Sequence, residues 1–255
     1  MKHLLFEVKQ FLIKSMRLFF SILAGGNSCV ACGSYTALIP VCRECDRKYF
    51  STKECLENRC TLCGKELVSL EGRCMKCRSE PLLVNLDRLY PLFSYRLWNK
   101  SLLFEWKIEG KRALSEFFAG KITSILKKLS MGVVIPVPPR KGKIRQKGWD
   151  QINELAEFLK RRYGFRVLNL LVRLSEQEQK KLSREERLEK IKTAYVLVKP
   201  SRLKRILKPF SGKIPEEVCL VDDVSTTGST LECCAAVLKK AGVKKVFAVT
   251  LFTVD

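Results

Sequence analysis

Downstream of Pro81 the apolar residues fall into two alternating patterns. Short apolar runs bounded by polar or turn residues predict strands at 89–95, 131–137, 166–171, 218–221 and 246–252. Longer segments with apolar residues at helical spacing predict helices at 102–129, 152–162 and 229–240. Gly110 is a candidate break in the first helix. Strands that alternate with helices of this length indicate an α/β fold with a mostly parallel sheet and flanking helices.

The first 28 residues have a different pattern. Their apolar residues lie near one face of a helix, and cations interrupt the run at Lys9, Lys14 and Arg17. The apolar stretch is shorter than the roughly 20 residues that a bilayer-spanning helix needs. We therefore expect residues 1–28 to form an amphipathic helix that packs on the body of the protein. We expect no membrane span and a cytoplasmic location.

Cysteines dominate the segment that follows. The chain has 12 cysteines, and eight of those between residues 29 and 77 form Cys-x-x-Cys pairs: Cys29/Cys32, Cys42/Cys45, Cys60/Cys63 and Cys74/Cys77. This spacing suits a turn whose two sulfurs face one metal ion. A disulfide-rich secreted module is the alternative, but it would need an export signal. We predict a double zinc ribbon over residues 29–80 and a second domain over 81–255.

The pairing of the four Cys-x-x-Cys motifs is open at this point. The chain repeats a Cys-x-x-Cys-Gly motif followed by a plain Cys-x-x-Cys, which favours one zinc ion on Cys29, Cys32, Cys42 and Cys45 and a second on Cys60, Cys63, Cys74 and Cys77. A cross-braced pairing fits the same spacing. Either way the sites are four-coordinate and structural, and each supplies about 10–16 kcal/mol to a segment with little apolar core. Cys55 has no partner at zinc spacing.

The segment 218–231 carries the clearest ligand-binding pattern. An apolar strand is followed by Asp222 and Asp223, then by a loop of small hydroxylated residues, then by a helix. Hydroxyls and N–H groups at a helix N-terminus can hold a phosphate, and two carboxylates can hold a pair of ribose hydroxyls. The pattern therefore predicts a site for a 5-phosphorylated ribose. It lacks the Gly-x4-Gly-Lys-Ser/Thr sequence of a Walker loop.

These residues resemble the phosphoribosyl pyrophosphate (PRPP) signature of type I phosphoribosyltransferases. With the cysteine pairs and the segments 135–139 and 147–151, the chain is similar to the ComF/GntX family, in which a zinc ribbon precedes a phosphoribosyltransferase domain. The resemblance implies that Asp222 and Asp223 hold the ribose hydroxyls of PRPP, which binds with Mg²⁺. It also implies that Arg140 and Lys141 face the pyrophosphate. The 5-phosphate would be held by Thr226, Thr227, Gly228, Ser229 and Thr230.

The chain departs from the family pattern in ways that bear on catalysis. Lys147, Trp149 and Asp150 stand where the family has Arg, Phe and Asn. Lysine keeps the charge of arginine but loses its bidentate geometry. Thr226 stands where some relatives have an aspartate general base, and the single histidine, His3, lies in the predicted N-terminal helix. The sequence thus predicts PRPP binding, whereas phosphoribosyl transfer would need an acceptor pocket that no residue identifies.

Charge points to a second ligand. The chain has 48 Lys and Arg against 26 Asp and Glu, a net charge of +22, and more than half of the excess lies in 131–217. Such a surplus favours a polyanion. The first cationic run is Arg140, Lys141, Lys143, Arg145 and Lys147, beside Trp149, which could stack on a base. The second lies in a predicted loop between two prolines and contains Lys199, Arg202, Lys204, Arg205, Lys208 and Lys213.

We therefore expect single-stranded DNA as a partner. Proteins of the resembled family are associated with DNA uptake, which implies a role in natural transformation and a DNA translocase as a further partner. One alternative is that the first cationic run serves pyrophosphate alone. Another is a non-catalytic DNA-binding factor whose PRPP site is vestigial or regulatory. A zinc-ribbon factor for transcription or RNA processing would leave 218–231 unexplained.

Overall fold

The computed structural model describes residues 7–8, 11–12, 15–16, 27–36, 39–52, 57–67, 72–95, 97–139, 148–174 and 194–254. Most of the expected N-terminal helix, the first cationic run at 140–147 and Cys55 lie outside these residues. In the described part of the chain, no helix combines the length and the apolar character that crossing a membrane requires.

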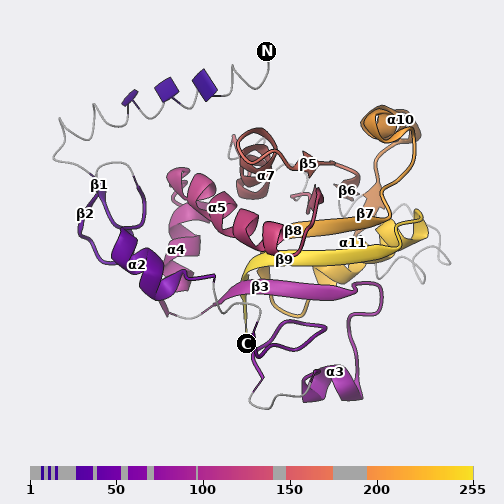
Figure 1. Ribbon diagram of the computed structural model, residues 1–255, viewed down its shortest axis with the longest axis horizontal. Coiled ribbons are helices and arrows are strands. Elements are labelled where there is room, and N and C mark those ends of the chain that lie inside the picture. The colour runs from indigo at the N-terminus through magenta and orange to yellow at the C-terminus, as the bar shows by residue number, and fades with distance from the viewer. Residues whose placement is uncertain are drawn as a thin grey trace.

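A five-stranded parallel sheet forms the centre of the fold, in the order β3-β9-β8-β4-β5 (Figure 1). Its strands are β3 (Arg88–Ser94), β4 (Val133–Pro136), β5 (Arg166–Val167), β8 (Glu217–Ser225) and β9 (Lys245–Thr253). The predicted α/β class with a mostly parallel sheet is confirmed. The run at 166–171 differs from its prediction, because it contributes to two short strands: β5 and then β6 (Leu171–Arg173), which pairs antiparallel with β7 (Tyr195–Leu197).

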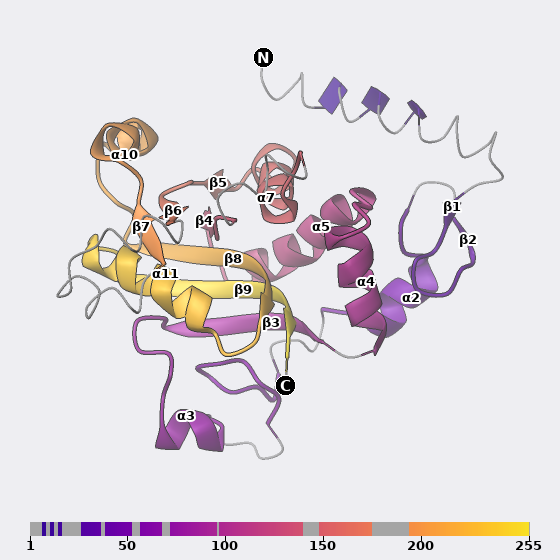
Figure 2. The ribbon, with the colours of Figure 1, turned by 180° about the vertical axis from the view of Figure 1, so that it is seen from behind.

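Helices cover both faces of the sheet. On one face lie α4 (Leu97–Lys107), α5 (Ala113–Lys128) and α7 (Gln151–Arg161), and on the other lies α11 (Ser229–Lys240), as Figures 1 and 2 show from opposite sides. The predicted helix 102–129 is divided into α4 and α5 at Gly110. Gly110 has a φ of 71°, a conformation that costs glycine little.

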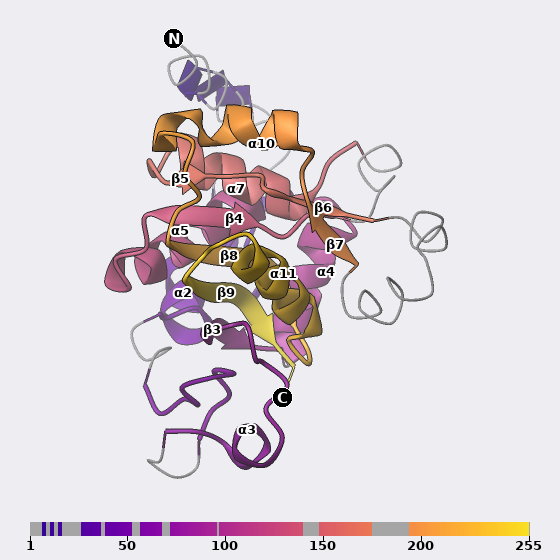
Figure 3. The ribbon, with the colours of Figure 1, turned by 90° about the vertical axis from the view of Figure 1, so that its right-hand side faces the viewer.

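The second cationic run is a helix, so the predicted loop between the two prolines was wrong. Helix α10 (Pro200–Leu207) continues into the 3-10 turn η1 (Lys208–Phe210). Pro200 occupies the first turn, where its missing N–H has no intrahelical partner to lose. Leu203, Ile206 and Leu207 pack on the core at helical spacing. Figure 3 shows α10 beyond the β5 edge of the sheet and α3 (Met75–Ser79) beyond the β3 edge.

The cysteine region packs on the sheet domain in two separate places. Strands β1 (Asn27–Ser28) and β2 (Tyr35–Thr36) and helix α2 (Arg43–Tyr49) accompany the first four cysteines, and α3 accompanies the second four. Cys29 and Cys45 belong to the core on the α4, α5 and α7 face. Cys60 and Cys77 belong to the core on the α11 face. Each half of the repeat therefore contacts a different face of the sheet.

Candidate ligand site at the carboxyl ends of the sheet

The neighbouring strands β4 and β8 form the switch point of the sheet. From β4 the chain continues to β5 on one side, and from β8 it continues to β9 on the other. In open α/β sheets, ligands bind beyond the carboxyl ends of the strands at such a point. Here those ends lead into the proline-rich segment 137–139 and into the loop 225–228. The predicted PRPP loop thus lies where the topology favours a ligand.

Strand β8 is longer than the predicted strand 218–221. It continues through both acids to Ser225, because its backbone stays paired with β9, with Asp222 opposite Thr250 and Val224 opposite Phe252. Successive side chains of a strand point to opposite faces. The two carboxylates are therefore not side by side: Asp223 faces α4 and α7, and Asp222 faces α11.

Asp223 is held by two side chains from different helices. Its Oδ2 accepts a hydrogen bond from Lys107 Nζ at 2.8 Å and another from Gln151 Nε2 at 2.7 Å. Only 7% of Asp223 is exposed. Burial acts to raise its pKa, but the ammonium of Lys107 and the hydrogen bonds outweigh burial and hold the pKa below its usual value. Asp223 is thus an ionised, fixed carboxylate.

Asp222 has the opposite electrostatic setting. In the described part of the chain no cation forms an ion pair with it, and its Oδ1 accepts a hydrogen bond from the backbone N–H of Asp223 at 2.9 Å. Burial, followed by the neighbouring charge of Asp223, raises its pKa well above the usual value. Burial and then the charge of Asp222 also raise the pKa of Cys234 on α11, which agrees with the face to which Asp222 points.

A buried hydrogen-bond chain fixes the helices that reach Asp223. Trp106 Nε1 donates to Ser115 Oγ at 2.8 Å, and Ser115 Oγ donates to Glu154 Oε2 at 2.6 Å. Arg112 Nε donates to the other oxygen of Glu154 at 2.6 Å. These contacts join α4, α5 and α7, and so they set the distance between Lys107 at the end of α4 and Gln151 at the start of α7.

The sequence did not identify Lys107. It lies far from Asp223 along the chain, inside a segment whose pattern indicates only a helix, and its role depends on the tertiary fold. Asp150, which departs from the family pattern, has a structural role instead. Its Oδ1 accepts hydrogen bonds from the N–H groups of Ile152 at 3.1 Å and Asn153 at 3.0 Å, so it caps the N-terminus of α7.

The loop after β8 has the geometry of a small-anion cradle. Gly228 is buried with a φ of 79°, while Thr226, Thr227, Ser229 and Thr230 are exposed. Thr227 Oγ1 and Ser229 Oγ lie 2.7 Å apart, and Ser229 begins α11. The first N–H groups of a helix lack intrahelical acceptors. The structure thus brings the predicted phosphate residues together, just beyond the two acids.

The eight predicted metal ligands form two groups that follow the order of the sequence. Cys29, Cys32, Cys42 and Cys45 lie together, as do Cys60, Cys63, Cys74 and Cys77, with all sulfurs of a group within 4.8 Å of one another. The tandem arrangement is present among these eight residues, and the cross-braced one is not. We name them the first and second four-cysteine groups.

The sulfur geometry of both groups fits a tetrahedral metal such as zinc. The sulfurs of Cys32 and Cys42 are 3.8 Å apart, and those of Cys63 and Cys74 are 3.7 Å apart. Tetrahedral zinc with Zn–S bonds of about 2.3 Å would separate its sulfurs by about 3.8 Å. In each group a backbone N–H also donates to a sulfur at 3.3 Å, from Cys42 to Cys29 and from Cys74 to Cys60.

Three of the eight thiols, Cys29, Cys32 and Cys60, have a lowered pKa, whereas burial raises the pKa of Cys45, Cys63 and Cys77. The Ser34 hydroxyl, together with the Ser34 backbone, lowers the pKa of Cys32 to about 6. For Cys60, burial acts upward, but backbone hydrogen bonds from Cys74 and Cys63 prevail and lower the pKa to about 6. Each group thus contains at least one thiol whose pKa is lowered toward the thiolate form that metals bind.

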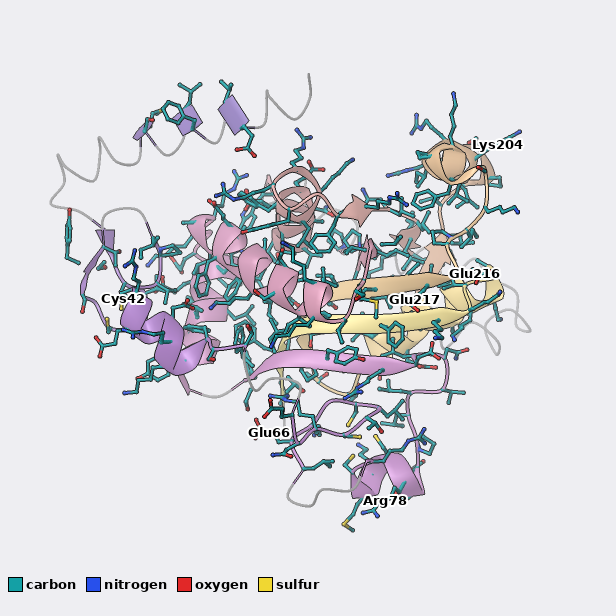
Figure 4. All side chains as sticks on the ribbon, in the orientation of Figure 1. Cys42, Glu66, Arg78, Lys204, Glu216 and Glu217 are labelled. Carbon is teal, nitrogen blue, oxygen red and sulfur yellow. The ribbon has the colours of Figure 1, made fainter. Side chains whose placement is uncertain are left out.

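The predicted DNA-binding residues are divided between two settings. Trp149 packs partly buried against the core with the Arg112 guanidinium 5.8 Å above its ring, which leaves less of that ring for a base. The cations of α10 and η1 are exposed: Arg202, Lys204, Arg205 and Lys208. Within the described residues none of these four pairs with an acid. Figure 4 shows Lys204 pointing away from the sheet, at the end where Glu216 and Glu217 open β8.

Comparison with known proteins gives two related sequences. No family model matches the chain. The chain is 30% identical over 213 residues to competence protein ComFC of Streptococcus pneumoniae, covering 81% of this chain and 84% of that protein. It is 26% identical over 224 residues to competence protein ComFC of Bacillus subtilis, covering 84% and 82%. With an extended match of this length, a parallel α/β sheet and two four-cysteine groups, the chain belongs to the ComF family.

Proposed function

We propose that this chain acts in DNA uptake during natural transformation, and that it binds PRPP at the carboxyl ends of β4 and β8. The competence proteins that it matches support the cellular role. The observation that carries the ligand is the exposed hydroxyl loop 226–230 at the start of α11, just beyond the fixed carboxylate of Asp223. The phosphate would lie in this loop and the ribose hydroxyls at Asp223, because Asp222 points to the opposite face of β8.

Magnesium would accompany the pyrophosphate of PRPP rather than a site built by the chain. The carboxylates of Asp222 and Asp223 point to opposite faces of β8, and Lys107 already neutralises Asp223. Mg²⁺ would supply charge neutralisation of the pyrophosphate when it is bound. Lys107 and Gln151 would keep Asp223 oriented toward the ribose.

Calorimetric titration of the zinc-loaded protein with PRPP and Mg²⁺ tests this site. We expect binding, and we expect Asp223→Asn to weaken it at least about tenfold, since a charged hydrogen-bond acceptor is worth about 1.5–3 kcal/mol. Glu216→Gln is the matched control, because Glu216 is an exposed acid at the other end of β8. No binding by the unchanged protein would reject PRPP. Binding without pyrophosphate release toward any acceptor would favour a regulatory site over phosphoribosyl transfer.

We further propose that α10 and η1 contact single-stranded DNA. Their exposed cations lie at the amino end of β8, away from the loop 226–230, so a small ligand at that loop does not account for them. The first cationic run and a translocase partner stay predictions of the sequence. The cytoplasm is the expected compartment, since thiol pairs that bind metal are typical of reducing surroundings.

Fluorescence anisotropy with a labelled oligo-dT tests the α10 surface. Arg202→Glu combined with Arg205→Glu should weaken binding at least about tenfold and flatten the salt dependence by about 1.4 in log–log slope, because each phosphate contact on a single strand contributes about 0.7. Lys127→Glu combined with Lys160→Glu makes the same charge change at two exposed lysines elsewhere. An equal loss in both double variants would mean that net charge alone, and not this surface, binds DNA.

A further inference from the structure

A cavity separates the second four-cysteine group from the loop that follows β8. Its volume is about 290 Å³. Three ligands of the group form one wall, namely Cys63, Cys74 and Cys77, and residues 225–228 form another. Leu82 and Leu83, from the segment that joins the group to β3, and Leu89 of β3 contribute apolar lining. The candidate phosphate loop and a candidate metal site therefore border the same space.

The segment after the second four-cysteine group supports the sharpest turn of the loop. Leu83 is 5% exposed and packs directly against Gly228. A Cβ placed on Gly228 would come within 2.8 Å of Leu83 Cδ2. Because Gly228 also has a φ of 79°, a side chain at position 228 would both strain the backbone and collide with Leu83.

The same segment also holds the first turn of α11. Glu232 Oε1 accepts hydrogen bonds from the backbone N–H of Asn85 at 2.8 Å and from Asn85 Nδ2 at 2.6 Å. Glu232 Oε2 accepts another from the N–H of Leu86 at 3.1 Å. Residues 83–86 thus contact the loop at Gly228 and again one helical turn later, which brackets the predicted phosphate cradle.

The second four-cysteine group in turn fixes this segment. The N–H of Leu89 donates to the carbonyl of Leu62, between Cys60 and Cys63, at 2.8 Å. Gly64 lies so close to the Leu89 carbonyl and the Pro91 ring that any Cβ there would collide with both. Small modules with four thiolate ligands typically owe their folding to the bound metal, which contributes far more than these few contacts could. Residues 83–89 are thus attached to the second four-cysteine group on one side and, through the pairing of β3 with β9, to the sheet on the other.

The first four-cysteine group has none of these connections. Among the described residues, none of its cysteines lines the cavity. It is attached through Phe50, whose ring meets Phe93 at 5.3 Å and Phe117 at 5.5 Å in edge-to-face contacts. Lys121 on α5 forms an ion pair with Asp46 on α2 at 2.5 Å. These contacts stabilise the opposite face of the sheet.

We propose that metal at the second four-cysteine group sets the shape of the loop 225–229, so that ligand binding at this loop depends on the second metal and not on the first. The group is a positioning device for the loop and touches no reacting atom. The identity of the ligand rests on the proposed function, but the coupling between metal and loop does not.

Hydrogen exchange of matched variants tests the coupling without any ligand. Cys74→Ser and Cys42→Ser alter equivalent cysteines of the repeat, each partly buried and each preceding a short helix. Each variant should lose about one equivalent of zinc, measured by release to a chromogenic chelator. We expect Cys74→Ser to speed amide exchange in 226–232 about tenfold or more, which corresponds to loosening by about 1.4 kcal/mol, and Cys42→Ser to leave it unchanged.

A second variant distinguishes a local effect on the loop from unfolding of the whole protein. Leu83→Ala keeps all eight sulfurs and removes the contact with Gly228, so it should speed exchange in 226–232 while both zinc equivalents stay bound. Unchanged exchange in Leu83→Ala and Cys74→Ser, or an equal increase in Cys42→Ser, would overturn the proposal. PRPP titration of the unchanged protein is interpreted separately from the exchange measurements. If it fails while the exchange pattern holds, the proposed ligand is wrong and the coupling stands.

Discussion

The two faces of the sheet carry similar groups, but these groups have different surroundings. Each face takes one four-cysteine group and one acid of the Asp222–Asp223 pair. On the α4, α5 and α7 face, Asp223 is neutralised by Lys107, and the first group is attached by the aromatic contacts of Phe50. On the α11 face, Asp222 has a raised pKa, and the second group borders a cavity.

The difference indicates how two similar four-cysteine groups could have different roles in one protein. The sulfurs of the two groups have nearly the same geometry, so the divergence lies in what each group packs against. Edge-to-face aromatic contacts and the Lys107–Asp223 ion pair lie on one face. The Gly228 turn and the cavity beside the second group lie on the other. Stability and exchange measurements on chosen variants test this contrast.

Metal removal should have the largest effect. Each structural zinc contributes about 10–16 kcal/mol to the folding of its own cysteine segment, so a strong chelator should unfold both segments and lower the stability of the sheet domain on which they pack. The first group should be stripped sooner, since Cys32 is exposed whereas every cysteine of the second group is at least partly buried. Zinc release followed with time, beside circular dichroism, checks both points. Single-phase release with an unchanged melting curve would contradict them.

Truncation of Phe50 should have the next largest effect. Phe50 is 1% exposed, and removing a buried phenylalanine typically costs about 3–5 kcal/mol. Phe50→Ala should therefore lower the urea midpoint strongly while exchange in 226–232 keeps its rate. Phe104→Ala is the control, because Phe104 is 53% exposed on α4 and should change stability by less than about 0.5 kcal/mol. A faster-exchanging loop in Phe50→Ala would mean that the faces are coupled.

Replacing Asp222 or Asp223 by asparagine should change the free energy of unfolding in opposite directions. Asp223→Asn leaves Lys107 without its partner and should cost about 1–3 kcal/mol at pH 7. That cost should vanish as pH falls through the lowered pKa of Asp223, where the wild-type carboxylate is also protonated. Asp222→Asn removes a carboxyl that favours the neutral form, and should stabilise by about 1 kcal/mol at pH 7.

The gain from Asp222→Asn should also depend on pH. A raised pKa gives stability that is full below the unfolded value and is lost as pH rises through the folded value, so the advantage of the amide should fade toward about pH 4. Urea denaturation between about pH 2 and pH 8 measures both variants, because the lowered pKa of Asp223 lies below about pH 4. Equal changes of one sign would show that the two carboxylates share one environment.

Replacement of Asp150 by the family residue should have the smallest effect. Asparagine and aspartate cap helices about equally well, so Asp150→Asn should stay within about 0.5 kcal/mol of the parent, while Asp150→Ala should cost about 0.5–2 kcal/mol. Thermal melts compare the two. A large loss with asparagine would indicate that the charge at position 150 does more than cap α7.

Much of the fold could be predicted from the pattern of apolar residues, because burial imposes the periods of strand and helix. The limits of α11 agree with their prediction. The extension of β8 through Asp222 and Asp223 could not be found in this way, since backbone pairing with β9 determines it. Helix α10 had a signal in Leu203, Ile206 and Leu207, but the flanking prolines and cations favoured a loop.

The candidate site was predictable only where it is local in sequence. The loop 226–230 and the cysteine pairs are short motifs whose geometry depends on neighbouring residues. Lys107 meets Asp223 only because three helices pack in one arrangement. The tandem arrangement of the four-cysteine groups and their separation onto two faces likewise follow from tertiary packing, which motif spacing does not determine.

The length of β8 has an electrostatic consequence. At about 3.3 Å per residue, the nine residues of β8 extend about 30 Å from its amino end, near which the cations of α10 lie, to the loop 226–230. That distance exceeds three Debye lengths at physiological ionic strength, where each is about 8 Å. Two polyanions held at opposite ends of this strand would scarcely repel each other. A nucleic acid on α10 and a phosphorylated sugar at the loop could therefore bind to one molecule at the same time, as independent rather than competing ligands.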